Sequence, residues 1–318
     1  MNLSSQINPL QDLSKNEGNS QKMKYQSLVL SGGGIKGISY CGALEVLEEK
    51  GILKGITNFA GTSAGAIVAA FLAVGYNVKE IYKIMNDMNM RDLIDDKSGI
   101  IRDGINLVES YGVAPGKSIM KLLGKLIMTK TLEKDYTINQ LFRDKGIKLV
   151  IVGTDITIGS SKYFYPNDSP TGNISIRKAV RISMGIPFVF VPVLHENNLH
   201  IDGGVLDNYP LHVFDGEYPG DPNARLDLCP IKDNVLGLRI TVHPQGTKND
   251  ITGLLSFGMS IISTFMSENN RRMLTSVNLK RTIQIVTPDY PVTYFDVSES
   301  DKKTLIDAGK QCTMKFFK

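Results

Sequence analysis

The chain has 318 residues, of which 42% are hydrophobic and 21% are charged, and its formal net charge is +4. This length supports one large α/β domain or two small ones, and the composition is that of a globular protein rather than a fibrous or disordered one. An excess of four positive charges is too small to indicate a nucleic-acid partner.

The cysteines and the N-terminal segment indicate in which cellular compartment the protein is expected. Cys41, Cys229 and Cys312 lie far apart, which argues against a disulfide framework or a zinc site and favours a reducing compartment. The polar N-terminus lacks the apolar core of a secretory signal, and residues 1–24 are predicted to be a disordered tail before a single domain at 25–318. We therefore expect a cytoplasmic protein. A non-Sec secretion route would leave no trace in these features, so secretion as an effector stays open.

No transmembrane helix is predicted, because no run of about 18 consecutive apolar residues is present. The longest apolar-rich segment, 251–266, is interrupted by Gly, Ser and Thr. Any contact with a membrane is therefore expected to be peripheral, although a local basic face toward anionic lipid stays open.

The first part of the chain repeats a strand–turn–helix unit. An apolar run at 26–30 predicts a buried strand, the glycines that follow end it, and apolar residues at helical spacing continue over 38–50. The second unit has a strand at 56–60 and, after a tight turn, a helix at 66–74 that is apolar on every side and hence buried.

The rest of the chain continues the alternation of strands and helices. Two capping boxes are predicted, at Asn77 with Glu80 and at Thr137 with Gln140. Residues 91–136 are a candidate cap over the functional site or a plain surface insertion. The later elements are predicted in this order: strands at 148–155 and 162–165, a helix at 174–184, strands at 199–201 and 235–242, a helix at 254–273, a strand at 282–286 and a helix at 300–317. This order predicts a mostly parallel sheet covered by helices on both faces.

A candidate nucleophile lies in the second unit. Ser63 is the centre of a Gly61-x-Ser63-x-Gly65 pattern between a predicted strand and a predicted helix. Such a turn exposes the serine hydroxyl at the carboxyl end of the sheet, and the helix that follows directs its positive end toward it. The alternative is a serine that only caps this helix.

A candidate oxyanion hole lies in the first unit. Gly32, Gly33 and Gly34 can present backbone N–H groups without interference from side chains, which is what a developing oxyanion needs. A dinucleotide-binding loop is the competing interpretation, but no acidic residue ends a second strand at the expected distance. Lys36 is expected either to orient this loop or to hold an anionic head group, unless it is simply a solvated lysine.

A serine nucleophile needs a base, and two candidates are present. Asp202 ends a short strand and opens Asp202-Gly203-Gly204, where a partly desolvated carboxylate could accept the proton. The chain order Ser63, Asp202, His243 also matches a triad of the α/β-hydrolase type. We favour Asp202 alone, because the serine turn follows only the second strand; an ordinary Asp-Gly turn is the alternative interpretation.

Taken together, these motifs resemble those of the patatin-like phospholipase family. Four blocks occur in the family's order: Gly32-Gly33-Gly34-Ile35-Lys36-Gly37, Gly61-Thr62-Ser63-Ala64-Gly65, Arg181-Ile182-Ser183-Met184-Gly185-Ile186-Pro187 and Asp202-Gly203-Gly204-Val205-Leu206-Asp207-Asn208-Tyr209-Pro210. Lys36 stands where many members carry Arg, and Met184 with Gly185 replaces more usual small or polar residues.

The resemblance implies a three-layer α/β/α patatin-like fold and hydrolysis of fatty acyl esters in phospholipids or other lipids. It implies a Ser63–Asp202 dyad, an oxyanion hole formed by the glycine loop and the N–H of Ala64, and supporting roles for Lys36, Gly61, Gly65, Gly203 and Gly204. No metal and no cofactor are expected. The expected partners are an acyl-lipid substrate and a peripheral membrane surface, while a homo-oligomer or a protein activator stays open. The rival functions are a non-lipid esterase or thioesterase and a lipid-binding protein of the same fold with weak or no turnover.

Overall fold

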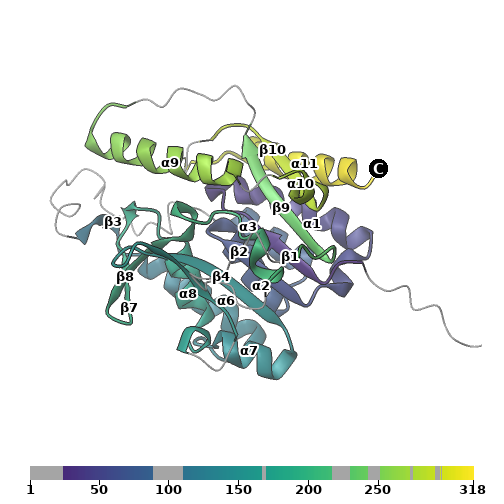
Figure 1. Cartoon of the computed structure of the whole chain (residues 1–318), viewed down its shortest axis with the longest axis horizontal. Coiled ribbons are helices and arrows are strands. Elements are labelled where there is room, and N and C mark those ends of the chain that lie inside the picture. The colour runs from purple at the N-terminus through teal and green to yellow at the C-terminus, as the bar shows by residue number, and fades with distance from the viewer. Residues whose placement is uncertain are drawn as a thin grey trace, which may run out of the picture.

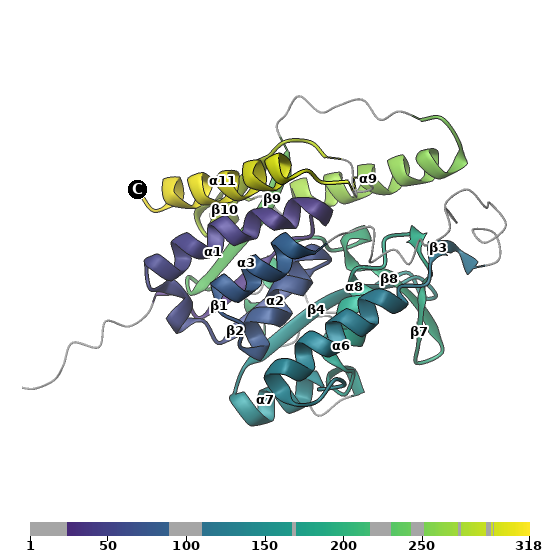
Figure 2. The same cartoon turned by 180° about the vertical axis from the view of Figure 1, so that it is seen from behind.

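The computed structural model describes residues 24–88, 110–166, 170–216, 230–242, 251–272, 275–290, 294 and 296–318. The predicted tail up to residue 23, residues 91–109 of the candidate cap and His243 lie outside these ranges. The described chain forms one central sheet with helices packed against it (Figures 1 and 2). None of its helices is both long and apolar enough to span a bilayer.

The central sheet is mostly parallel. Its strands are β1 (Ser27–Leu30), β2 (Asn58–Thr62), β4 (Lys148–Asp155), β5 (Ser160–Phe164), β7 (Val193–His195), β8 (Asn198–Asp202), β9 (Val235–Val242) and β10 (Thr282–Thr287). Their order is β10-β9-β1-β2-β4-β8-β7, and β5 pairs with β4. The strands from β10 to β4 are parallel, whereas β5, β7 and β8 form antiparallel pairs at one side. Because β1 and β2 run parallel, the loops after both strands meet at one edge of the sheet.

The helices are α1 (Ser39–Glu49), α2 (Ala64–Val74), α3 (Val78–Asp87), α6 (Lys117–Thr131), α7 (Ile138–Lys145), α8 (Ile176–Ser183), α9 (Leu254–Arg272), α10 (Ser276–Lys280) and α11 (Glu299–Phe316). Short 3-10 helices are η1 (Gly34–Ile38), η2 (Ile52–Gly55), η4 (Pro170–Gly172), η5 (Gly203–Val205) and η6 (Leu211–Phe214). Both predicted capping boxes are confirmed, at the starts of α3 and α7.

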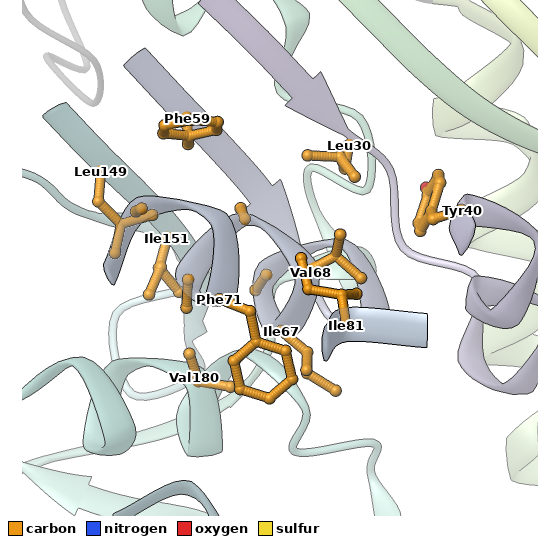
Figure 3. Close-up of a cluster of buried hydrophobic side chains, with 14 of the residues drawn as sticks. Leu30, Tyr40, Phe59, Ile67, Val68, Phe71, Ile81, Leu149, Ile151 and Val180 are labelled. Carbon is orange, nitrogen blue, oxygen red and sulfur yellow. The ribbon is translucent and has the colours of Figure 1, made fainter. Parts of the chain in front are cut away.

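The two faces of the sheet have different covers. Successive side chains of a strand point to opposite faces, so Leu28 and Leu30 lie on one side of β1 and Val29 on the other. The first face packs against α1, α2, α3, α6, α7, α8 and α11 in one large core. Figure 3 shows part of it, where α2 side chains such as Phe71 lie under β1, β2 and β4. On the second face, Val29 packs with residues of η6, among them Leu211.

Several parts of the architecture differ from the sequence prediction, among them β7 and α10, which were not predicted. The candidate cap at 91–136 includes α6, yet Ile119, Leu123 and Ile127 of α6 are buried in the main core, so this helix is part of the body of the domain. Two short strands that were not predicted, β3 (Gly112–Ala114) and β6 (Phe188–Phe190), form a separate parallel pair.

Candidate active site

Ser63 lies on a sharp turn between β2 and α2. Its φ of 52° and ψ of −122° put a residue with a side chain into a conformation that is rarely populated outside glycine. This geometry places the hydroxyl at the carboxyl edge of the sheet, as in nucleophile elbows, and Ser63 is only 5% exposed there. Because α2 begins at Ala64, the positive end of its dipole lies at the serine.

The two glycines of the motif allow the turn to be this tight. A Cβ on Gly61 would lie 2.5 Å from the carbonyl carbon of Gly65, and a Cβ on Gly65 would lie 2.6 Å from the carbonyl oxygen of Ser31. Real Cβ atoms do not approach backbone below 3.0 Å. A side chain at either position would therefore push α2 away from β1 and β2.

Ser183 fixes the backbone of the elbow from α8. The Ser63 N–H donates to Ser183 Oγ at 2.9 Å, and the Ser183 hydroxyl donates to the carbonyl of Val152 in β4 at 2.5 Å. Ser183 is fully buried. The sequence motif around Ser183 indicated the family but not this contact, since the two partners are distant in the chain.

Asp202 ends β8, which runs antiparallel to β4 with Asp202 opposite Gly153. Its Oδ1 accepts the Gly204 N–H at 2.7 Å, and the residue is only 1% exposed. The loop passes close to β4, because a Cβ on Gly203 would lie 2.6 Å from the carbonyl carbon of Val152. The two glycines thus hold the carboxylate in a buried position at the sheet edge.

The structure brings the Ser63 side chain to this carboxylate. Burial raises the pKa of Asp202 to about 7, and the Gly204 N–H and the Ser63 hydroxyl partly offset that rise. The Ser63 hydroxyl and Asp202 do not form a hydrogen bond of ordinary geometry, however. Within the described ranges the Oδ2 atom of Asp202 is buried and has no hydrogen-bond partner. A carboxylate with a pKa near neutrality and a free oxygen can accept a proton from a neighbouring hydroxyl.

The glycine loop after β1 lies against the elbow. A Cβ on Gly32 would be 3.2 Å from Ser63 Cβ, and a Cβ on Gly37 would be 2.7 Å from Ala64 Cβ. The Gly32 N–H already donates to the carbonyl of Asn208 at 2.9 Å, and Asn208 Nδ2 donates back to the Gly32 carbonyl at 3.4 Å. Gly32 is therefore held by Asn208 and has no N–H left for an oxyanion, contrary to the expectation from sequence.

Three other amides near Ser63 have no acceptor among the described residues. Within the ranges that the structure describes, the N–H groups of Gly33, Gly34 and Ala64 make no hydrogen bond. Gly34 adopts φ 56° and begins η1, and Ala64 begins α2, so two of these N–H groups are the first donors of a helical turn. Such donors are suited to negative charge that develops on a carbonyl oxygen.

Lys36 orients the loop rather than extending into solvent. Its Nζ donates to the Tyr290 carbonyl at 3.0 Å and lies 3.9 Å from Asp289 Oδ1. Burial lowers the pKa of this lysine, and Asp289 partly offsets the effect. The side chain thus ties η1 to the segment after β10.

The histidines in the described ranges have other neighbours. His200 Nε2 lies 3.6 Å from Asp155, His195 Nδ1 lies 3.3 Å from Lys178 Nζ, and His212 Nε2 lies 3.8 Å from Asp207. The fourth, His243, which the triad alternative needs, lies outside these ranges. No three His, Cys, Asp or Glu side chains come together as a metal site in the described part of the chain.

A comparison with known families identifies the family of the chain. The sequence profile of the patatin-like phospholipases matches residues 28–215, a segment that includes Ser63 and Asp202. The chain belongs to the patatin-like phospholipase family. The predicted family and the α/β fold class are thereby confirmed, and the chain is placed among lipid hydrolases.

Relatives of this patatin-like chain include two viral proteins. An uncharacterized protein of Acanthamoeba polyphaga mimivirus is 30% identical over 292 residues, which cover 89% of this chain and 91% of the relative. A probable lipid hydrolase of Invertebrate iridescent virus 6 is 31% identical over 192 residues, which cover 59% of this chain and 63% of the relative.

A solved structure shares the patatin-like fold. The crystal structure of VipD from Legionella pneumophila matches with a TM-score of 0.60 at 21% sequence identity, over 92% of this chain and 66% of VipD. The chain thus spans just under two thirds of VipD. At this level of identity the match shows the fold alone.

Proposed function

We propose that this patatin-like protein hydrolyses fatty acyl esters of phospholipids or related lipids, with Ser63 as nucleophile and Asp202 as base. The observation that carries the proposal is the buried Asp202 carboxylate with its unpaired Oδ2 beside the Ser63 hydroxyl. The positive φ of Ser63 and the free amides next to it support the same assignment.

The reaction divides into two half-reactions. In the first, Ser63 Oγ attacks the ester carbonyl carbon while its proton passes to Asp202 Oδ2. The tetrahedral oxyanion accepts hydrogen bonds from the N–H groups of Gly33, Gly34 and Ala64. Asp202 then protonates the leaving alcohol, and the C–O bond to that alcohol breaks to leave an acyl-serine. In the second half-reaction, Asp202 takes a proton from water, the hydroxide attacks the acyl carbon, and the fatty acid leaves as Ser63 regains its proton.

The substrate class is tested by incubating the purified protein with phosphatidylcholine, lysophosphatidylcholine, triacylglycerol, an acyl thioester and a short soluble ester, each at several concentrations. We expect fatty acid to be released from the phospholipid and the lysophospholipid with a kcat/KM at least tenfold above that for the soluble ester. Preference for the thioester or the soluble ester would replace the lipid hydrolase by a non-lipid esterase. Absence of product from all five would favour a lipid-binding protein without turnover.

The raised pKa of Asp202 predicts a pH dependence. Asp202 must be ionised to accept the serine proton, and its pKa lies at about 7. We therefore expect kcat/KM to fall as the pH drops below 7, by about tenfold per pH unit, and to level off above about 8. Initial rates between pH 4.5 and 9 with a soluble ester measure this directly. A profile whose acid limb has its midpoint near pH 4 would contradict the role of a buried base.

A further inference from the structure

Helix α9 lies against the loop that carries Asp202. The position of a Cβ on Gly204 is 2.6 Å from Met266 Cε, and that of a Cβ on Gly258 is 2.8 Å from the Phe188 ring. One side of α9 therefore packs on η5 and on the start of β6. The helix covers the same edge of the sheet at which the serine and the carboxylate meet.

The side of α9 next to this packed side is apolar and exposed. Phe257, Ile261 and Phe265 follow each other at intervals of four residues, which puts them in one row along the helix. Their exposed fractions are 51%, 40% and 61%. No charged residue occurs in the sequence between Ile251 and Met266. A row of this kind on a surface helix is unusual unless something covers it.

Other exposed apolar side chains lie at the same end of the molecule. The large apolar residues of the described ranges that are more than half exposed are Tyr111, Leu132, Ile156, Ile158, Leu194, Ile251, Phe257 and Phe265. Leu132 follows α6. The others lie in α9 or three residues before it, in the turn after β4, in β7, or just before β3. Figures 1 and 2 both show α9, β3, β7 and β8 at the end of the molecule away from the C-terminus.

The sheet register shows why these segments project past the active site. Thr62, at the end of β2, pairs with Val152 of β4, and β4 continues for three more residues to Asp155. Ile156 and Ile158 thus lie beyond the level of Ser63 along the strand direction. We call the exposed apolar residues of these segments the apolar rim: Tyr111, Ile156, Ile158, Leu194, Ile251, Phe257, Ile261 and Phe265.

We propose that the apolar rim, with α9 as its main element, inserts into the surface of a zwitterionic phospholipid bilayer and thereby presents the active site to its substrate. The occupant is a lipid surface because the rim is formed by separate projecting segments around a site that, under the proposed function, takes its substrate from that surface. A charged partner is disfavoured because 251–266, 110–116 and 156–161 contain no charged residue. Binding is therefore expected to depend on apolar insertion and little on salt.

The test uses sedimentation with phosphatidylcholine vesicles. All binding is measured on the Ser63→Ala protein, so that the vesicles stay intact, and Phe257→Ser/Phe265→Ser is added to it. Both phenylalanines are exposed, so their replacement leaves the core intact. The matched control is Met128→Ser/Leu132→Ser, which replaces two exposed apolar residues at the C-terminal end of α6, one in the helix and one just after it. Circular dichroism and the thermal midpoint establish that each variant is folded.

The rim variant is expected to bind vesicles at least tenfold more weakly than the parent protein, and the α6 variant to bind like the parent. Both results should hold at 50 mM and at 500 mM salt, about the range over which screening weakens interactions between exposed charges. With Ser63 present, the rim variant should keep its activity on a soluble ester and lose it on vesicles. Unchanged vesicle binding by the rim variant, no binding by the parent, or a self-association in sedimentation velocity that depends on Phe257 and Phe265 would each overturn the proposal.

This inference rests on the proposed function but fails separately from it. Vesicle binding of the Ser63→Ala protein reports on the rim without any hydrolysis. Release of no fatty acid from vesicles that the Ser63-containing protein does bind would remove the proposed function and leave the rim in place.

Discussion

Ser63→Ala and Asp202→Asn are each expected to lower kcat for acyl-ester hydrolysis by at least about 10³-fold, with both proteins folded. Alanine at position 63 removes the atom that attacks the ester. Asparagine at position 202 keeps the shape of the side chain and its hydrogen bond from the Gly204 N–H, but an amide cannot take the serine proton. Because the two residues act in one step, the double variant should be no slower than the slower single variant.

Two exposed residues provide matched controls for these substitutions. Ser276 is at the exposed start of α10, and Asp233 is exposed just before β9. Ser276→Ala and Asp233→Asn should leave kcat within a factor of two, an allowance of about 0.4 kcal/mol. If His243→Ala abolishes activity while Asp202→Asn retains it, the base is the histidine of the triad alternative and the dyad is wrong.

Asp202→Asn is also expected to make the protein more stable at pH 8, even though it removes activity. The folded-state pKa of Asp202 is raised by burial from 3.8 to about 7. Below about pH 4 the carboxyl is protonated in both states. Between about pH 4 and 7 the folded state still holds the proton while the unfolded chain has released it, so stability falls as the pH rises. Above pH 7 the folded protein carries the full cost of a buried charge.

The size of this gain follows from the shift. The difference between about 7 and 3.8 is about 3 pKa units, or roughly 4 kcal/mol. The new amide N–H has no acceptor at the position of Oδ2, which offsets part of this gain. We therefore expect the free energy of unfolding to rise by about 2 kcal/mol at pH 8. Below pH 4 the charge cost is absent and only the cost of the amide remains, so the variant should be less stable than wild type there by about 2 kcal/mol. Urea unfolding at both pH values measures this, with Asp233→Asn as the control.

A decrease in stability of the Asp202→Asn protein at pH 8 would contradict the account of the carboxylate. It would mean that Asp202 is stabilised as an anion by partners that the site geometry does not include. A base of that kind would have a low pKa and little power to take a proton from serine. The stability measurement therefore tests the environment of Asp202 independently of any substrate.

Much of the fold could be predicted because local and global preferences agree. β4 and β9 are mainly apolar runs with the observed bounds of 148–155 and 235–242, as expected for strands that are buried on both faces. The α2 segment is apolar all round, and the structure buries nearly all of it. Where the turn residues, the hydrophobic pattern and the burial of a segment all favour the same element, that element can be predicted from one sequence.

The missed elements are those that depend on tertiary contacts. β3 and β6 have three residues each and pair only with each other, so neither has a periodicity of its own. The helix expected at 38–50 is preceded by a 3-10 turn at 34–38, which the positive φ of Gly34 permits and Lys36 ties to the segment after β10. Helix α6 lies in a segment that was expected to be a cap or a surface insertion. It packs instead against α8 and α2, which the sequence alone cannot indicate.

In the site, too, the residues in sequence motifs could be predicted and those that act through tertiary contacts could not. Ser63, Asp202 and the glycine loop were predicted from motifs, and the structure places them side by side. Ser183 and Asn208 act through contacts to residues more than a hundred positions away, and only the fold shows that they hold Ser63 and Gly32. The use of the Gly32 N–H by Asn208 could not be predicted for the same reason.

The identity of the nucleophile is tested most directly by reaction with a fluorophosphonate followed by peptide mass spectrometry. The account predicts a single phosphonyl adduct on Ser63, inactivation in proportion to labelling, and little or no adduct in the Asp202→Asn protein. An adduct on another serine, or a protein that hydrolyses lipid esters at full rate while Ser63 stays unlabelled, would contradict it.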